Sequence, residues 1–483
     1  MASFHSDGNI LIRNVRLPYS DKDRATKVWC VECKGGCVVS ISPANRDRRP
    51  TGSSGLGPFE FEVEKNSFVD GGGGLMLPSF CHSHIHLDKC YILDRCGDLV
   101  KGNFGEAMKV TKAAKEEFPK DLDDLYARGA RLIRQSVEHG VTAMRAHVEI
   151  DTSVGFACLE AALKLQSDFR AHSDVQIAIF AQEALFDSVD HQIPGENFAL
   201  LSQAAVRHGV SVIGSAPYVE PSIEKAKKNI GLIFDLADSH GLGYVDFHLD
   251  YNLDAKSEPL IYEVIAQATR RYHTTVEHST SSGTAATRPS CPRITIGHAT
   301  RLQLFSPGEW RALADAISGL PITFVGLPQS DMYMQGREFQ DEPLGAPRGT
   351  LRVPYLAQRY GIEIAMSVNN VDNAFTPQGS LDPLSLCSFG VGIFQAATPE
   401  DIRVLLRAVT LTSRIAITGT KPPIDLAPGV GDQADFVILH ERQTLQGAVL
   451  DPPFDRTTIK GGRVVACRRS VRWFSDGNNS RFV

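Results

Sequence analysis

Residues 138–150, EHGVTAMRAHVEI, place a single glycine between a helix-like segment and a mostly apolar run. Glycine readily adopts the left-handed conformation that closes a helix, and a strand inside a parallel sheet is buried on both faces. In residues 121–140, the apolar side chains that lead up to this glycine recur at helical spacing. The stretch therefore predicts a helix, a cap at Gly140 and a buried strand.

Three further segments repeat this order, with their glycines at positions 209, 241 and 361: RHGVSVIGSAPY, SHGLGYVDFHLD and RYGIEIAMSVNN. Four more apolar runs, GLMLPSFCHSHIH, VQIAIFAQEA, RITIGHAT and PITFVGLPQ, bring the number of expected strands to eight. The expected strands are residues 76–84, 141–149, 175–182, 210–216, 244–249, 293–298, 321–327 and 362–369. Eight strands alternating with helices over this length predict an α/β fold, a (β/α)8 or TIM barrel.

The two ends of the chain are expected to lie outside this barrel. Residues 1–75 carry the β-rich runs NILIRNVRL, VWCVECKGGCVVSIS and FEFEVE, and residues 418–483 carry GDQADFVIL and DRTTIKGGRVVACRR. Neither piece is long enough to bury a core alone, so we expect them to pair into one small β-sandwich domain. The barrel then comprises residues 76–417, with a loop, TSSGTAATRPSC, inserted at residues 280–291.

Composition limits the classes of partner. The 483 residues carry a formal net charge of -6 without long runs of either sign, which argues against nucleic acid and anionic membranes. We expect a small-molecule substrate and a homo-oligomer. We also expect a cytoplasmic location, because the sequence has no signal peptide or membrane-spanning run. Among ten cysteines, only Cys30, Cys33 and Cys37 cluster, and a strand leading to a turn at Gly35-Gly36 explains them better than a metal site.

Histidines recur where the expected strands end, which is the functional face of a β/α barrel. They are His84 and His86, His147, His248 and His298. Residues two apart on a strand point to the same side, so His84 and His86 can both face inward and bind one metal ion. Three protein ligands and one water are the pattern of a catalytic zinc site.

The chain resembles the amidohydrolase superfamily, in its cytosine deaminase-like branch. The matching pieces, in order, are PSFCHSHIHLDK, RAHVEID, IFAQEA, VDFHLD, GHATRL, FVGLPQSDMYMQGR, SVNNVDNAFTPQGSLDPL and a closing GDQADFVIL with GGRVV. The resemblance implies one divalent metal ion, zinc first and iron or manganese as alternatives, with His84, His86 and His248 as its ligands. It also implies that His298 orients the metal-bound water and that Gln182 binds a heterocyclic substrate.

The sequence departs from the deaminase pattern at three positions. Tyr251 stands where the pattern has a glutamate that shuttles protons, Asn369 where an aspartate ligates metal, and Asn370 where another aspartate contacts substrate. An amide in place of a carboxylate leaves the site more positive, which favours an anionic substrate.

Several side chains are candidates for the work of the missing acid and base. Tyr251 and Asp250 are the candidate catalytic groups beside His298, and Asn369 keeps the place of a metal ligand. Asn370, Arg337 and Lys89 are candidate substrate-binding residues. Structural roles remain open for them: Arg337 in a salt bridge, Lys89 paired with Asp88, and Tyr251 as pocket lining.

Three functions are compatible with this pattern. The first is a metal-dependent hydrolase acting on a carbon–nitrogen bond (amide, cyclic amide or amine) of a small cyclic nitrogen compound. The second is a non-hydrolytic reaction at the same metal site, such as cyclisation, isomerisation or C–C cleavage of a small anionic metabolite. The third is a binding protein without activity, which the retained histidines argue against. We expect no useful deamination of cytosine itself, because the acid and the base of that reaction are both replaced.

Overall fold

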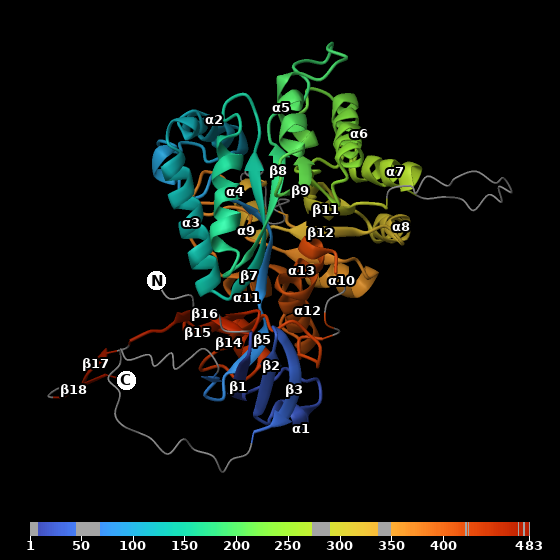
Figure 1. Ribbon diagram of the computed structural model, residues 1–483. Coiled ribbons are helices and arrows are strands. Elements are labelled where there is room, and N and C mark those ends of the chain that lie inside the picture. The colour runs from blue at the N-terminus through green and yellow to red at the C-terminus, as the bar shows by residue number, and fades with distance from the viewer. Residues whose placement is uncertain are drawn as a thin grey trace, which may run out of the picture.

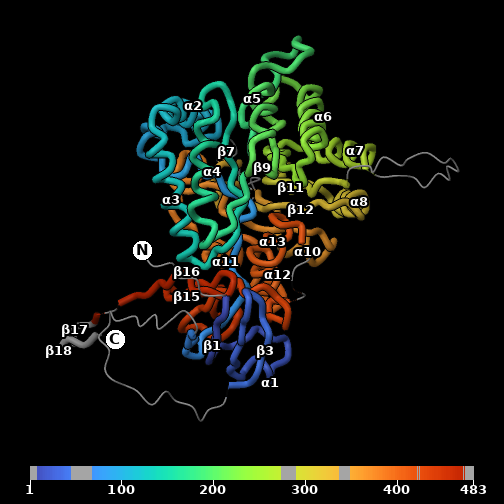
Figure 2. The backbone as a smooth tube through the Cα atoms, viewed as in Figure 1, coloured from blue at the N-terminus to red at the C-terminus, as the bar shows by residue number. Residues whose placement is uncertain are grey.

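The computed structural model describes residues 8–44, 68–272, 290–336, 349–420, 423, 425–471, 473–476 and 479–482. Figure 1 shows a large α/β part and, below it, a smaller β-rich part built from both the blue N-terminal and the red C-terminal segments. The backbone tube in Figure 2 shows the same division. The chain therefore has the two-part organisation that the sequence predicts.

Eight parallel strands form one sheet in sequence order. They are β6 (Phe80–His86), β7 (Val141–Glu149), β8 (Asp174–Ala181), β9 (Val210–Ser215), β10 (Tyr244–Leu249), β11 (Arg293–His298), β12 (Ile322–Gly326) and β13 (Ile364–Met366). A parallel bridge between Ile85 and Asn369 joins the two ends of this sheet. The backbone N–H of Asn369 donates to His84 O at 3.2 Å, and that of His86 donates to Asn369 O at 2.9 Å. The sheet thus closes into the TIM barrel, as predicted.

Helices cover the outside of the barrel and connect its strands. In chain order they are α2 (Phe104–Lys115), α3 (Leu122–Glu138), α4 (Ala157–Phe169), α5 (Glu196–Ala205), α6 (Ile223–His240), α7 (Ile261–Tyr272), α8 (Pro307–Ile317), α9 (Pro328–Met334), α10 (Val353–Tyr360), α11 (Pro383–Phe394), α12 (Pro399–Val409) and α13 (Leu411–Thr418). Short 3-10 turns lie at Leu93–Arg95, Phe118–Lys120, Pro217–Val219 and Thr300–Leu304. Helix α3 buries Leu132, Ile133 and Val137, the apolar face that its sequence predicts.

The four glycines that define the pattern all have positive φ angles. These angles are 100° at Gly140, 95° at Gly209, 63° at Gly241 and 65° at Gly361. A residue with a side chain rarely adopts such angles, so glycine suits these turns. Gly241 and Gly361 cap α6 and α10, and Gly140 directly follows the cap residue of α3. At Gly209 the predicted cap is wrong, because α5 already ends at Ala205 and Gly209 lies directly before β9.

Two four-stranded sheets make up the smaller part. One has the order β3-β2-β1-β4, from β1 (Ile10–Val15), β2 (Trp29–Lys34), β3 (Cys37–Pro43) and β4 (Phe68–Asp70). The other has the order β16-β15-β14-β5, from β5 (Leu75–Pro78), β14 (Phe436–Leu439), β15 (Arg456–Lys460) and β16 (Arg463–Arg468). One apolar cluster contains Ile12 and Val31 from the first sheet and Phe436 and Ile459 from the second. The two ends of the chain therefore share a core, as expected of a sandwich.

Three shorter elements complete the described chain. They are α1 (Lys22–Ala25), α14 (Leu445–Leu450) and the hairpin of β17 (Trp473–Asp476) with β18 (Asn479–Phe482).

The expected first barrel strand, residues 76–84, is two strands in the structure. Strand β5 pairs with β14 in the small sheet, and β6 begins the barrel only at Phe80. Pro78, which has no N–H to donate, ends the first strand, and the N–H of Ser79 bonds to Asp435 O instead. The run FEFEVE, residues 59–64, lies outside the described residues, as do residues 280–289 of the inserted loop.

The clustered cysteines lie in a β-hairpin. Cys33 on β2 pairs with Val38 on β3, and Lys34 pairs with Cys37 across the Gly35-Gly36 turn. Every cysteine of the described chain is a free thiol. The strand-and-turn explanation is confirmed. Among the described helices, none has the length and apolar character that crossing a membrane requires.

Candidate active site

Five histidines from four barrel strands, the adjacent pairs β6 with β7 and β10 with β11, meet inside the barrel. The ring of His84 lies 4.3 Å, centre to centre, from those of both His147 and His248, and 5.5 Å from that of His86. The ring of His298 lies 5.3 Å from that of His248. Burial lowers the pKa of His84, His86 and His248 well below 6.5, and neighbouring histidines add to the effect. These imidazoles are therefore neutral at neutral pH, the form that binds metal.

Many polar atoms of this cluster have no partner within the described part of the chain. Both ring nitrogens of His84, Nδ1 of His86, Nδ1 of His147 and Oδ1 of Asn369 are buried without a hydrogen bond. Buried polar atoms are almost always paired, so a group of unpaired ones points to something that binds them. Neutral imidazole nitrogens beside a carboxylate are a common donor set for a divalent transition metal ion, so the residues present fit such an ion.

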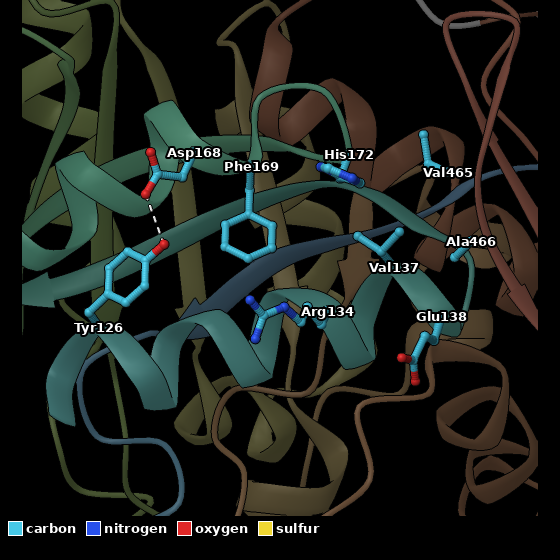
Figure 3. A pocket seen from close by; sticks show the side chains of 9 residues that line it. All are labelled: Tyr126, Arg134, Val137, Glu138, Asp168, Phe169, His172, Val465 and Ala466. Carbon is cyan, nitrogen blue, oxygen red and sulfur yellow. Dashed lines mark hydrogen bonds between the residues drawn. The ribbon is translucent and has the colours of Figure 1, made fainter. Parts of the chain in front are cut away.

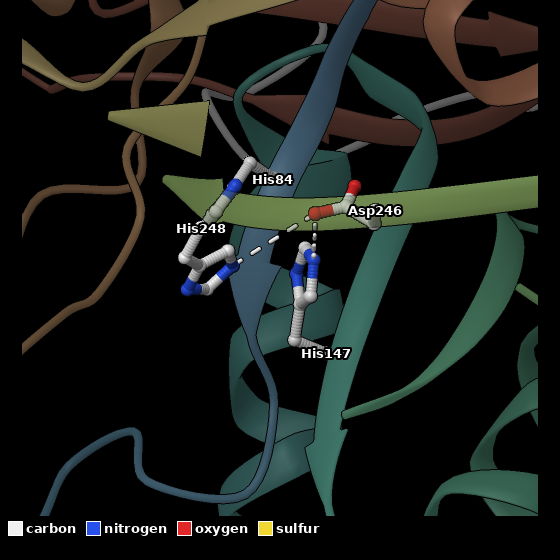
Figure 4. A group of neighbouring side chains, drawn as sticks. All are labelled: His84, His147, Asp246 and His248. Carbon is white, nitrogen blue, oxygen red and sulfur yellow. Dashed lines mark ion pairs between the residues drawn. The ribbon is translucent and has the colours of Figure 1, made fainter. Parts of the chain in front are cut away.

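Asp246 brings a carboxylate to the histidines. Ligand atoms of His84, His147, Asp246 and His248 all lie within 4.8 Å of one another (Figure 4). Asp246 Oδ1 lies 3.1 Å from His147 Nε2 and 3.9 Å from His248 Nε2. Its Oδ2 accepts a hydrogen bond of 3.0 Å from Arg145 Nη1. Burial alone would raise the pKa of Asp246, but His147 and Arg145 hold it below its usual value, so this carboxylate is ionised.

A second group of possible ligands, His86, Asp88 and Glu149, has its carboxylates engaged already. Glu149 forms ion pairs with Lys89, at 2.6 Å, and with Lys115. Asp88 accepts hydrogen bonds from the backbone N–H groups of Lys89, at 2.8 Å, and Glu149, at 2.6 Å. Among the described residues, only the histidine and Asp246 group has several ligand atoms to spare, which fits one ion.

A small pocket opens above the histidines. Eight of its lining residues are ones that the sequence singles out: His86, Lys89, Gln182, His248, Tyr251, His298, Asn369 and Asn370. Phe104, Tyr218, Ser330 and Phe375 complete the lining. His84 lies beneath it, in contact with the rings of the other histidines. The structure thus brings most of the candidate residues to one place.

One described candidate, Asp250, lies elsewhere. The carboxylate of Asp250 accepts the backbone N–H groups of Leu260, at 2.7 Å, and Ile261, at 3.2 Å, and so caps the start of α7. Burial raises its pKa to about 6. Because Asp250 does not line the pocket, its selection as a catalytic group receives no support from the geometry. Arg337 lies outside the described residues.

Aromatic rings form the upper walls of the pocket. The ring of Phe104, at the start of α2, lies 5.5 Å from that of Tyr251, 6.1 Å from that of Tyr218 and 5.8 Å from that of Phe375. Tyr251 in turn lies 4.2 Å from the ring of His298. Rings at such spacings contact one another edge to face or at a tilt, and so form a continuous apolar wall.

His298 is held in one orientation by a carboxylate. Its Nδ1 lies 2.9 Å from Asp331 Oδ1, while Asp331 Oδ2 accepts a 2.7 Å hydrogen bond from Thr350. Donation of Nδ1–H to Asp331 leaves Nε2 as the basic nitrogen. His298 also has a φ angle of 65°, and Asn369 one of 71°. Such strained backbone at two side chains of one pocket is typical of functional sites.

Sequence reasoning missed Asp246 and Asp331, and it noted His147 without making it a site residue. Asp246 lies two residues before His248 on the same strand, so its inward direction follows from strand parity. Asp331 lies in the quoted segment FVGLPQSDMYMQGR, 33 residues after its partner His298, and only the fold shows that they meet.

A wider depression lies on another face (Figure 3), between the last turns of α3 and α4 and the strand β16. Tyr126 donates there to Asp168 at 2.8 Å. The depression lies at the end of the barrel where strands begin, whereas function in this fold lies where they end. We therefore assign the site to the pocket above the histidines.

No known family model matches the chain. The pterin deaminase of Rhizobium rhizogenes is 26% identical over 396 residues, which are 81% of this chain and 80% of that protein. The N-isopropylammelide isopropyl amidohydrolase of Pseudomonas sp. strain ADP is 21% identical, over 95% of this chain and 97% of that protein.

Solved structures share the fold. The 5-methylcytosine deaminase of Klebsiella pneumoniae has a TM-score of 0.77 and 21% identity, over 97% of this chain and 100% of that one. Atrazine chlorohydrolase TrzN of Arthrobacter aurescens, complexed with zinc, has a TM-score of 0.59 and 15% identity, over 94% of this chain and 95% of that one. The resemblance to the amidohydrolase superfamily is confirmed. The amidohydrolase fold and the histidine and Asp246 group together support the prediction of one divalent metal ion, zinc first.

Proposed function

We propose that this amidohydrolase-like protein is a metal-dependent hydrolase that cleaves a carbon–nitrogen bond on a small planar nitrogen ring. The observation that carries the proposal is the cluster of neutral, unpartnered histidine nitrogens at the floor of a small, aromatic-walled pocket. The relatives are named for hydrolysis of ring compounds, a pterin and an ammelide. They favour hydrolysis over the alternative of a cyclisation, isomerisation or C–C cleavage.

His84, His86 and His248 are the proposed protein ligands of the ion, and Asp246 supplies the negative charge that Asn369 lacks. When bound, a divalent ion lowers the pKa of water and so supplies a nucleophile at neutral pH. In the overall reaction, water adds to the ring carbon and the C–N bond breaks; one proton of the water leaves with the amine, and the other stays on the ring product.

His298 is the proposed proton acceptor. Its Nδ1–H is held by Asp331, so the basic Nε2 is the nitrogen left to face the pocket. Tyr251 is the proposed hydrogen-bond donor to the substrate. Burial, with the nearby Asp331, raises its pKa well above 10, so the phenol keeps its proton at neutral pH. It donates a hydrogen bond where the deaminase pattern has a carboxylate shuttle.

The aromatic walls hold the ring in place. Phe104 and Phe375 on the upper wall and Tyr218 beside them offer flat apolar faces. Stacking on such faces orients a planar ring without regard to its substituents. The reacting carbon then faces the histidines below.

The test is amine release from a panel of rings, by metal-loaded protein in water enriched in oxygen-18. Pterin, an N-alkylated aminodioxotriazine and cytosine represent the chemistries suggested by the relatives and the resemblance. We expect release of ammonia or alkylamine from at least one of the first two, with one labelled oxygen in the ring product. A product without solvent oxygen would contradict hydrolysis.

Self-association and a cytoplasmic location stay predictions. Sedimentation of the purified chain and localisation of the tagged chain in cells test them directly.

A further inference from the structure

We infer that α2 is the gate of this pocket: Phe104 closes its mouth, and Lys115 is a positioning residue that holds the far end of the helix. The inference rests on the proposed function for its premise that substrate binds in the pocket. It follows from the burial of the lining residues, from the contacts among their rings and from how the two ends of the helix are held.

A layer of aromatic rings closes the mouth of the pocket. Of the twelve lining residues, nine are buried, and the three that keep some exposure are Phe104, Tyr218 and Tyr251. Their rings lie 5.5, 5.8 and 6.1 Å from one another, centre to centre. Rings in contact have centres about 4.5–7 Å apart, so these three leave no passage for a further ring between them. A planar substrate therefore enters only when one of them moves.

The two tyrosines lie in segments that are tied to neighbouring elements. Tyr251 directly follows Asp250, whose carboxylate holds the start of α7. Glu220, two residues after Tyr218, is buried and accepts two backbone N–H groups of the segment after β8, at 2.7 and 3.2 Å. Moving either tyrosine would disturb these bonds.

Phe104 belongs to a helix that is held by little apolar surface. The buried side chains of α2 are those of Ala107, Thr111, Ala114 and Lys115, whereas α3 buries leucine, isoleucine and valine side chains. Because the stabilisation from burial grows with the apolar area removed from water, α2 is attached more weakly than α3.

The loop before α2 is bound to the helix that it precedes. The carboxylate of Glu106 accepts the backbone N–H groups of Val100, Lys101 and Gly102, at 2.9, 2.9 and 2.6 Å. Gly97, just before this loop, has a φ angle of 68°, and a Cβ there would meet nothing within 4 Å. Glycine adopts many backbone conformations, so the chain can bend at Gly97 while loop and helix keep their shared hydrogen bonds.

Lys115 fixes the other end of α2. It is buried, and its Nζ pairs with Glu149 and, at 2.8 Å, with Asp151. Burial alone would lower the pKa of Lys115, but the two carboxylates raise it above its usual value, so the lysine is charged. Glu149 also pairs with Lys89 at 2.6 Å, and Asp151 accepts two backbone N–H groups, at 2.8 and 2.9 Å. Breaking a buried ion pair leaves a charge uncompensated, so this end of the helix stays in place.

A small rotation about Lys115 is enough to open the mouth. Phe104 is the first residue of α2 and Lys115 the last. At the rise of an α-helix they lie about 17 Å apart, so a rotation of about 20° moves Phe104 by about 6 Å. That displacement matches the spacing of two rings in contact.

The rate at which a small reagent reaches the pocket tests the gate. Ser330→Cys places a thiol at a buried position of the lining. Its alkylation by iodoacetamide is followed by peptide mass spectrometry in zinc-treated protein. Cys387, which is fully buried on α11, is the internal standard, because it reacts only when the fold around it opens. The ratio of the two rates therefore reports opening of the pocket apart from unfolding.

Two further substitutions in this reporter protein identify the parts of the gate. Phe104→Ala is expected to raise the ratio by at least about tenfold, because the mouth loses its closing ring. Lys115→Met should raise the ratio as well, because α2 loses its pivot. Lys115→Arg, which keeps the charge, should raise it less. An unchanged ratio in Phe104→Ala would overturn the gate.

Matched controls show whether the position of each substitution matters. Lys112→Met, at an exposed position of the same helix, and Phe454→Ala, at an exposed position before β15, should leave the ratio unchanged. Equal ratios in Lys112→Met and Lys115→Met would overturn the role of Lys115. If Lys115→Met does not fold, Asp151→Asn replaces it, since it removes one of the two partner charges. A ratio that Asp151→Asn does not raise would then overturn that role.

Alkylation needs no turnover, so the outcomes separate the gate from the proposed function. A raised ratio in Phe104→Ala, without amine release from any ring by the wild-type protein, would support the gate and overturn the proposed function. Amine release by the wild-type protein, with an unchanged ratio in Phe104→Ala, would overturn the gate and leave the hydrolase intact.

Discussion

Asp246 and His248 lie two residues apart on β10, so both side chains point into the barrel. Replacing Asp246 by Asn keeps its size but removes the charge next to the histidines, whether Oδ1 binds the ion or accepts an imidazole N–H. We expect the affinity for zinc to fall by about 10–100-fold, measured by competition with a chelator. Asp254→Asn, at an exposed position, is the control. Unchanged affinity in a folded Asp246→Asn protein would show that the ion lies away from this carboxylate.

His298 is the proposed proton acceptor and is not among the proposed ligands of the ion. His298→Ala is expected to retain one metal ion per chain and to lose about 10²–10⁴-fold in kcat, the usual contribution of a positioned acid or base. Asp331→Asn should lose a smaller part of the rate, because the imidazole stays but its tautomer is no longer fixed. Metal content and kcat are measured on the same samples. Equal loss of metal from His298→Ala and His248→Ala would make His298 a ligand.

For single residues, the sequence was sufficient where their spacing along the chain predicts which side chains lie together. The H-x-H spacing of His84 and His86 and the recurrence of histidines at strand ends predicted residues that the structure brings into one cluster. The spacing does not reveal a contact with a distant partner. Asp250 accepts the backbone N–H groups at the start of α7, which begins eleven residues later at Ile261. The part that Asp331 plays in orienting His298 follows only from their contact in the structure.

At the scale of elements, the glycines that precede barrel strands differ in how closely side chains pack against them. A Cβ at Gly140 would lie 2.7 Å from the Val437 side chain, where φ is 100°, whereas at Gly241 nothing lies within 4 Å. Gly140→Ala therefore adds a clash to the backbone strain, and we expect a loss of about 2–4 kcal/mol in unfolding free energy. Gly241→Ala should lose about 1–2 kcal/mol, from strain alone. Urea unfolding compares them, and equal losses would contradict the packing at Val437.

The glycine and apolar-run pattern predicted the barrel strands closely, because a buried parallel strand is specified by its own sequence. Strand β10, Tyr244–Leu249, has the expected bounds. The first strand was less accurate, because residues 75–78 are as apolar as a barrel strand but pair with β14. Which sheet such a segment joins is decided by a partner more than 350 residues away in the sequence.

At the scale of the whole molecule, one buried ion pair ties the small sheets to the barrel. Arg456 on β15 donates to both oxygens of Asp382, at 2.6 and 2.7 Å, and also to His139 O at 2.9 Å. Asp382 in turn caps α11. Arg456→Met leaves a buried carboxylate unpaired, so we expect a loss of about 3–5 kcal/mol in unfolding free energy. Arg442→Met, whose partner Asp451 is 81% exposed, should lose about 1 kcal/mol or less. Similar losses in the two variants would contradict this role.

We propose that the barrel holds one divalent ion, and that cleavage of a ring carbon–nitrogen bond requires this ion. The most direct measurement is amine release from the N-alkylated aminodioxotriazine by metal-stripped protein, as zinc is added back in steps. The account predicts activity that rises in proportion to bound zinc and levels off at one ion per chain, with His248→Ala inactive throughout. Full activity in the metal-free protein, or release that does not follow zinc occupancy, would contradict it.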